Sequence, residues 1–158
     1  MTILVDTREK ENTHILELFD KAKIVHKKKA LKYGDYSFMI PKNEVLNIPR
    51  DMYFDKQIVI ERKGSLEELS SNLTNSRDRF EKELSLAPAN KALVIENADY
   101  EKLIKGDYNT QYNKKSFFAS LHKFWFKYNI PFVFMPDSKY TGVFIRGYFE
   151  QYLRNYLH

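Results

Sequence analysis

Short apolar runs alternate with longer amphipathic stretches along the chain. The apolar runs predict β-strands, at residues 3–6, 23–31, 36–40, 58–63, 91–96 and 131–135. The amphipathic stretches predict helices, at residues 13–21, 66–73, 76–86, 99–105, 114–128 and 139–157. No repeat, linker or low-complexity segment interrupts this order. We therefore predict a single α/β domain over residues 1–158, with a central mixed sheet between helices in an α/β/α sandwich.

The strand predicted at residues 58–63 ends in a group of charges. Alternate residues of a strand face the same way, so Glu61 and Lys63 share one sheet face and Arg62 lies on the other. Asp35, on a Gly-Asp turn before another predicted strand, is a carboxylate that can join them. Two carboxylates and a lysine form a minimal site for metal-dependent phosphodiester cleavage. Glu-Arg-Lys alone is more typical of a solvated, charged strand end than of an active site, so the surrounding segments decide.

Four segments in a fixed order resemble the XPF/Hef family of structure-specific DNA nucleases, within the PD-(D/E)xK superfamily. That family's motif is Gly-Asp, a spacer, then Glu-Arg-Lys-x-x-x-Asp. The segments are Val5-Asp6-Thr7-Arg8-Glu9, Gly34-Asp35-Tyr36, Glu61-Arg62-Lys63-Gly64-Ser65-Leu66-Glu67 and Ser71-Asn72-Leu73-Thr74-Asn75-Ser76-Arg77-Asp78-Arg79-Phe80-Glu81. The resemblance extends from Ile3 into the last helix. It implies a restriction-endonuclease-like fold and a stand-alone XPF-type nuclease domain.

The resemblance also implies a role for each matching residue. The ligands of Mg²⁺ or Mn²⁺ would be Asp6, Asp35 and Glu61. The catalytic set adds Lys63, which would position the hydroxide, and Glu67. The DNA-binding residues would be Arg8, Arg62 and Arg77. From its opposite face, Arg62 would either support the site or meet the DNA backbone.

The chain departs from the family pattern in three ways. Glu67 stands where the family has aspartate, and Glu68 would take that place if one residue were inserted before it. Glutamate reaches one methylene further, and Mg²⁺ tolerates little distortion of its octahedron. Residues 41–56 form a longer connection than the usual hairpin and predict an enlarged loop. The helix-hairpin-helix tail of many family members is absent.

Other charged residues leave alternatives open. Arg77 and Arg79 are two residues apart on a predicted helix, so they cannot both face the cleft; we choose Arg77. The lysines at 27–29 are interpreted as guards of an exposed edge strand rather than as a DNA contact. Glu96 ends a buried strand, where we favour a structural role. The 4 histidines show no metal-ligand spacing.

Composition narrows the class of protein further. A net charge of +5 and a pI near 9.2 fit a polyanionic partner such as DNA. The chain has no cysteine, which excludes disulfides, zinc–thiolate sites and thiol catalysis. That absence fits a reducing intracellular compartment, such as the cytoplasm of a prokaryote or a virus-infected cell. No apolar stretch predicts a membrane span or a signal peptide.

Aromatic residues in the last two helices exceed what the core can absorb. The residues concerned are Phe118, Trp125, Phe126, Phe144, Tyr148, Phe149 and Tyr152. The excess predicts a homodimer through the C-terminal helices, in preference to a stacking platform for unpaired bases. A dimer would also grip a branched substrate with two protomers at once.

The function that we predict is metal-dependent cleavage of branched DNA, such as flaps, forks or junctions, in repair, recombination or replication. One alternative is a catalytically silent DNA-binding partner subunit, although Asp35, Glu61 and Lys63 are all present. The other is a restriction-like enzyme that cuts duplex DNA, although 158 residues leave little room for sequence-recognition elements.

Overall fold

The structure is a computed structural model that describes residues 1–158. Every predicted helix and strand is present. The strands are β1 (Thr2–Val5), β2 (His26–Lys28), β3 (Tyr36–Ile40), β4 (Met52–Tyr53), β5 (Ile58–Lys63), β6 (Asn90–Glu96) and β7 (Phe132–Met135). The helices are α1 (Thr13–Lys21), α2 (Leu66–Leu73), α3 (Arg77–Leu86), α4 (Tyr100–Lys105), α5 (Lys114–Tyr128), the 3₁₀ turn η1 (Ser138–Tyr140) and α6 (Thr141–Tyr156). No helix has both the length and the apolar character needed to cross a membrane.

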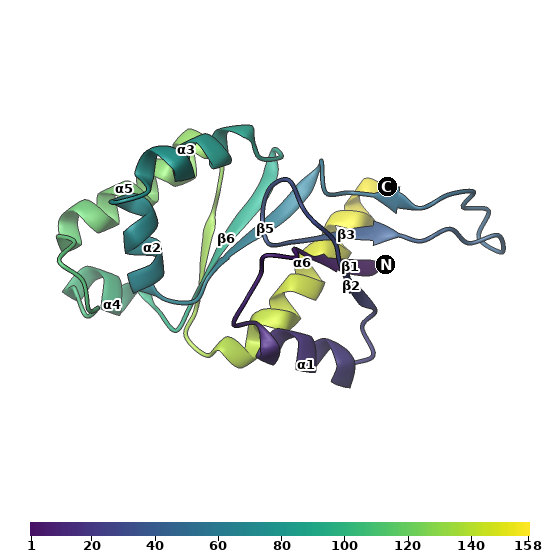
Figure 1. Ribbon diagram of the computed structural model, residues 1–158, viewed down its shortest axis with the longest axis horizontal. Helices are drawn as coiled ribbons and strands as arrows, with labels where there is room; N and C mark the ends of the chain where they lie inside the picture. The colour runs from purple at the N-terminus through teal and green to yellow at the C-terminus, as the bar shows by residue number, and fades with distance from the viewer.

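The strands form one seven-stranded mixed sheet in the order β2-β1-β3-β5-β6-β7, with β4 also paired to β3 (Figure 1). β3 runs antiparallel to β1, β4 and β5. The pairs β1–β2, β5–β6 and β6–β7 are parallel. The mixed α/β sheet predicted from the sequence is therefore confirmed. Its central antiparallel pairs place the end of β1 and the end of β5 on either side of the start of β3.

Helices pack on the two faces of the sheet in separate groups. Ile58 and Ile60 of β5 share a core with Ile15 of α1 and with Ile145 of α6. On the other face, residues of β6 and β7 share a core with α2, α3, α4 and α5. Figure 1 shows α2 to α5 gathered beside β6, and α1 with α6 beside β1 and β3. This arrangement gives each face a helical layer, but the layers cover different parts of the sheet.

The connection between β3 and β5 is a paired arm, and not only the loop that the sequence predicted. β4 continues the pairing with β3, and Asn43 and Ile48 form an isolated bridge further out. Figure 1 shows this segment projecting beyond the rest of the molecule. Val45 near its tip is 94% exposed. The insertion thus extends the sheet away from the helices.

Candidate active site at the meeting of three strands

Asp6, Asp35 and Glu61 lie at adjacent strand ends, and all three line one cavity of about 240 Å³. Backbone hydrogen bonds fix their order across the sheet. The amide of Asp6 donates to the carbonyl of Asp35 over 2.9 Å, and the amide of Asp35 donates to the carbonyl of Ile60 over 2.8 Å. The strand topology, rather than any local motif, brings these three positions together.

Gly34 allows the turn that carries Asp35 to approach β5 closely. Its φ is +77°, in the left-handed region that favours glycine. A Cβ at this position would lie 2.6 Å from the Cβ of Val59. Any other residue would push the turn away from β5, and Asp35 would move with it.

The carboxyl groups of Asp35 and Glu61 are electrostatically strained without a cation. Burial raises the pKa of Asp35 well above its usual value, and the negative charges of Glu61 and Glu9 raise it further. Burial also raises the pKa of Glu61, and the nearby Lys63 opposes that shift. A divalent cation between the two carboxylates would relieve both the burial cost and the repulsion. The site therefore has the electrostatic character of a metal site.

The donor set fits Mg²⁺ or Mn²⁺ held by two protein carboxylates. The structure contains no group of three or more His, Cys, Asp or Glu side chains arranged to hold a metal ion. Mg²⁺ is commonly bound through one or two carboxylates, with waters and substrate phosphates completing its octahedron. Asp35 and Glu61 supply hard oxygen ligands of this kind on the cavity wall.

Asp6, predicted as a third metal ligand, has other partners. Its Oδ2 accepts from the Arg8 Nε over 2.9 Å, and its Oδ1 accepts from the Leu31 amide over 2.8 Å. Arg8 in turn donates to the Leu31 carbonyl. These bonds hold Arg8 at the rim of the cavity, with 70% of its side chain exposed. The geometry gives Asp6 the task of positioning Arg8 and the loop before Gly34.

Lys63 shares the face of Glu61, as the strand period predicts. Its Nζ lies 3.4 Å from the Glu61 Oε1 and 5.1 Å from the centre of the Phe80 ring. Lys63 also lines a hollow beside the main cavity, together with Arg79 and other residues of α3. A buried amine beside an acidic pair is suited to orienting a water molecule or a phosphate oxygen.

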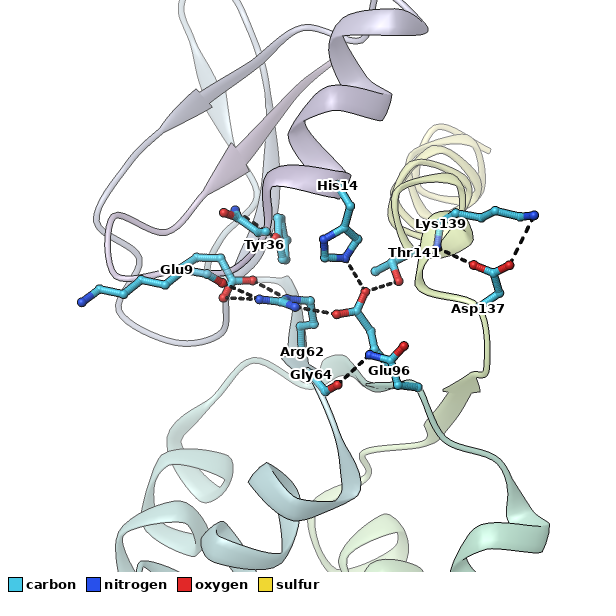
Figure 2. A network of polar contacts seen from close by, with 12 residues as sticks. Glu9, His14, Tyr36, Arg62, Gly64, Glu96, Asp137, Lys139 and Thr141 are labelled. Carbon is cyan, nitrogen blue, oxygen red and sulfur yellow. Dashed lines mark hydrogen bonds and ion pairs between the residues drawn. The ribbon is translucent and has the colours of Figure 1, made fainter. Parts of the chain in front are cut away.

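Arg62 faces away from the cavity into a buried ion network, shown in Figure 2. Its guanidinium donates to both carboxylate oxygens of Glu9, over 2.8 and 3.1 Å, and to the Lys10 carbonyl over 2.6 Å. Its Nη1 donates to Glu96 over 2.5 Å. Its backbone amide donates to the Asp35 Oδ2 over 2.7 Å. The structure therefore gives Arg62 the supporting role left open by the sequence, with a protein acceptor already at each of its three guanidinium nitrogens.

Glu96 extends this network to both helices on that face. It accepts from the Thr141 hydroxyl of α6, and the Nε2 of His14 in α1 lies 2.7 Å from its Oε2 (Figure 2). These hydrogen bonds and the bond to Arg62 lower the pKa of Glu96, although burial opposes them. Its contacts are structural, as the position at the end of a buried strand indicated. The network anchors β5 to β6, α1 and α6 directly behind the acidic pair.

Glu67 does not reach the acidic pair, contrary to the role that the family motif implied. Its Oε1 accepts from the Asn109 amide over 3.0 Å, and it lines a different pocket. Glu68, the alternative, accepts from the Gly64 amide, while the Ser65 hydroxyl accepts from the Glu68 amide. This reciprocal cap begins α2 immediately after Lys63. Both glutamates therefore serve local structure.

The choice between Arg77 and Arg79 must be reversed. Arg77 donates to the Ser120 hydroxyl and lies 5.2 Å from the centre of the Phe124 ring, so it faces α5. Arg79 is exposed and lines the hollow beside Lys63. The burial of Phe80 against Phe124 sets this rotation of α3. The sequence gives the helix but not its rotation about its axis.

Three charged residues of the cavity were missed by the sequence reasoning: Lys32, Glu83 and Lys91. The charge of Glu83 raises the pKa of Glu61 further. Lys91 is buried, and burial lowers its pKa. Its place in the register opposite Val59 gives it the sheet face of Glu61. That alternation was readable from the sequence, but the pairing of the two strands was not.

The sequence profile of the ERCC4 domain matches residues 5–147, so the chain belongs to the ERCC4 domain family. The structure of XPF from Aeropyrum pernix is similar, with a TM-score of 0.67 and 17% identity over 96% of this chain and 61% of that one. The same protein in complex with DNA gives a TM-score of 0.69 and 17% identity over 98% of this chain and 66% of that one. The chain thus spans about two thirds of the XPF chains. No curated protein matches it in a sequence comparison. The predicted family and fold are confirmed.

Proposed function

We propose that the protein is a Mg²⁺- or Mn²⁺-dependent endonuclease that hydrolyses phosphodiester bonds in branched DNA. The observation that carries the proposal is the half-buried pair Asp35 and Glu61, which lies on one cavity wall beside Lys63. Membership of the ERCC4 domain family supports DNA as the substrate. The XPF chain of similar fold was solved in complex with DNA, which gives further support.

Each residue of the site has a distinct task in this proposal. Asp35 and Glu61 would hold the cation, which when bound stabilises charge on the scissile phosphate and lowers the pKa of its water. Lys63, held beside Glu61, would orient the attacking water. Arg8 and Arg79, both exposed at the edge of the site, would bind neighbouring phosphates. Arg62 and its network keep the strand end in place.

A catalytically silent partner subunit is the main alternative, and the electrostatics argue against it. A chain that only binds DNA gains nothing from two half-buried carboxyl groups that repel each other, because their raised pKa values make the folded state less stable at neutral pH. The presence of Lys63 on the same sheet face as Glu61 is a further argument against a silent partner. A restriction-like duplex endonuclease would share this centre, so substrate preference separates it from the proposed activity.

The test is cleavage of labelled flap, fork, four-way junction and linear duplex DNA with Mg²⁺, Mn²⁺, Ca²⁺ or EDTA. The proposal expects cutting near the branch with Mg²⁺ or Mn²⁺, and none in EDTA. Cutting of linear duplex at least as fast as of branched DNA would favour the restriction-like enzyme. Binding of branched DNA without cutting under every condition would leave the silent partner.

We also propose a homodimer through the aromatic surface of α5. Phe126 is 84% exposed, and Phe118 and Trp125 of the same helix are 39% and 37% exposed. Phe149 is fully buried in the core, contrary to the sequence prediction. Phe144, Tyr148 and Tyr152 contribute less than the sequence indicated, because they pack against the core and Phe144 stacks on Tyr148. Light scattering at micromolar concentration is expected to give twice the 18.9 kDa chain mass. A monomer that still cuts branched DNA would overturn this proposal.

A further inference from the structure

No helix covers the sheet face that carries Glu61 and Lys63 where it extends over β1 and β3. The helices α2 to α5 share their core with β6 and β7, and not with β1 or β3. On this face, β1 and β3 contribute only Leu4 and Met39, packed with Leu31, to a cluster that contains no helical residue. The acidic pair therefore lies at the border between a helix-covered half and a helix-free half of one face.

Two lysines and a tyrosine form a strip on the surface of the helix-free half. Lys27 pairs with Leu4, and Tyr53 pairs with Met39, so their side chains share the face of Leu4 and Met39. The Nζ atoms of Lys27 and Lys29 lie 5.5 and 5.0 Å from the centre of the Tyr53 ring. We call these three residues the basic strip.

The convergence of the basic strip distinguishes it from a simple edge guard. Lysines that protect an edge strand point into solvent, whereas Lys27 and Lys29 come from alternate positions and meet over one ring. Lys29 has one acidic neighbour, Asp55, at 3.6 Å, and Lys27 has no ion pair. The two lysines therefore carry more positive charge than Asp55 can neutralise, and this charge lies over the ring of Tyr53. A phosphate backbone is the partner whose chemistry fits such a surface.

The distance from the basic strip to the acidic pair fits a DNA duplex. Met39, which pairs with Tyr53, lies four residues along β3 from Asp35. The distance between these two positions along the strand is about 13 Å. Backbone phosphates advance about 3.4 Å per base pair along a duplex. We therefore infer that the basic strip binds the phosphate backbone of a duplex arm, about four base pairs from the bond that is cut. This inference rests on the proposed nuclease function and adds where the uncut arm lies.

The experiment measures binding to forked DNA in Ca²⁺ by fluorescence anisotropy, over a range of salt concentrations. One fork carries a 20-base-pair arm, and the other has that arm shortened to about three base pairs. The test variant is Lys27→Ala with Lys29→Ala. The matched control is Lys114→Ala with Lys115→Ala, which removes the same charge from exposed residues beside Ile104 of α4.

Loss of two phosphate contacts is expected to reduce the slope of log affinity against log salt by about 1.8, and to weaken long-arm binding about tenfold. The short-arm fork should bind the strip variant and wild type alike. Lys27→Arg with Lys29→Arg should restore long-arm binding, and circular dichroism should show equal folding. If the strip variant binds the long arm as the control does, the inference is wrong and the lysines guard the edge or contact a protein. A wild-type protein that binds none of these DNAs would overturn the proposed function as well.

Discussion

The two faces of β5 carry charges that have opposite electrostatic environments. On the inner face, Arg62 is matched by Glu9 and Glu96, and each of its nitrogens has an acceptor. On the cavity face, burial raises the pKa of both Asp35 and Glu61, the charge of Glu61 raises the pKa of Asp35 further, and Lys63 offsets these shifts only in part. Residues one position apart thus divide between support and chemistry. Whether a charged side chain has a full set of hydrogen-bonding partners distinguishes the supporting residues from the residues of the site better than charge or burial does.

The largest expected effect is on catalysis by the cavity face. Glu61→Gln keeps the size of the side chain but removes a charged metal ligand. The rate of cleavage in Mg²⁺ should fall by several powers of ten, or about 3–5 kcal/mol in the activation barrier. Binding of forked DNA in Ca²⁺ should persist. Single-turnover cleavage measures the rate, and Glu67→Gln is the matched control. An unchanged rate in Glu61→Gln would show that the site is assigned wrongly.

The inner face should respond in stability instead. Arg62→Met keeps much of the side-chain volume but leaves Glu9 and Glu96 without their cation. Breaking a buried ion pair by removing one partner costs about 3–5 kcal/mol in free energy of unfolding. Urea denaturation followed by circular dichroism measures the loss. A variant as stable as wild type but defective in DNA binding would instead give Arg62 the DNA contact that its geometry opposes.

How far the sequence predicts these faces depends on the range of the interactions. Strand period alone placed Glu61 and Lys63 together, and helical spacing gave α5 its observed bounds of Lys114–Tyr128. β2 is shorter than predicted, since Lys23 has a φ of 57° and cannot begin a strand. Glu9 and Glu96 lie far from Arg62 in sequence, so no local pattern identifies them as its partners. The rotation of α3 likewise depends on tertiary packing.

When the metal is removed, the raised pKa values of the carboxyl groups on the cavity face should make the stability of the protein depend on pH. Asp35 and Glu61 have raised pKa values in the folded protein, so the folded state binds more protons than the unfolded state. Their contribution to stability is full below the ordinary carboxyl pKa and is lost as the pH rises through the raised values. In EDTA, the thermal stability of wild type relative to Asp35→Asn should therefore fall as the pH rises from about 4 toward neutrality, since carboxylates with lowered pKa values, such as Glu96, contribute equally in both proteins.

Added Mg²⁺ should reverse the same loss. A cation at about 100 times its dissociation constant stabilises the folded state by about 2.7 kcal/mol. Thermal melts at neutral pH with and without Mg²⁺ measure this shift. Glu61→Gln, which lacks one ligand, should show a smaller shift than wild type. An equal shift in both proteins would place the cation elsewhere.

Two arginines on α3 offer a finer comparison of support with chemistry. Arg79→Ala removes an exposed cation beside Lys63 and should weaken DNA binding several-fold, with a lower salt slope by about 0.9. Arg77→Ala removes the contacts with Ser120 and Phe124 and should lower stability more than binding. Anisotropy titrations and thermal melts on both variants separate the two. Weaker DNA binding in Arg77→Ala together with lower stability in Arg79→Ala would instead make Arg77 the DNA contact.

The smallest effect is expected at Glu67, where the family motif has aspartate. The Glu67 carboxylate accepts from the Asn109 amide and faces a pocket separate from the acidic pair. This hydrogen bond lowers the pKa of Glu67, which marks a satisfied surface carboxylate rather than a strained one. Glu67→Asp shortens the side chain and should weaken that bond, with cleavage unchanged to within about twofold. Kinetics in Mg²⁺ beside Asp35→Asn test this directly. A loss comparable to that of Asp35→Asn would mean that α2 moves on substrate binding and brings Glu67 to the metal after all.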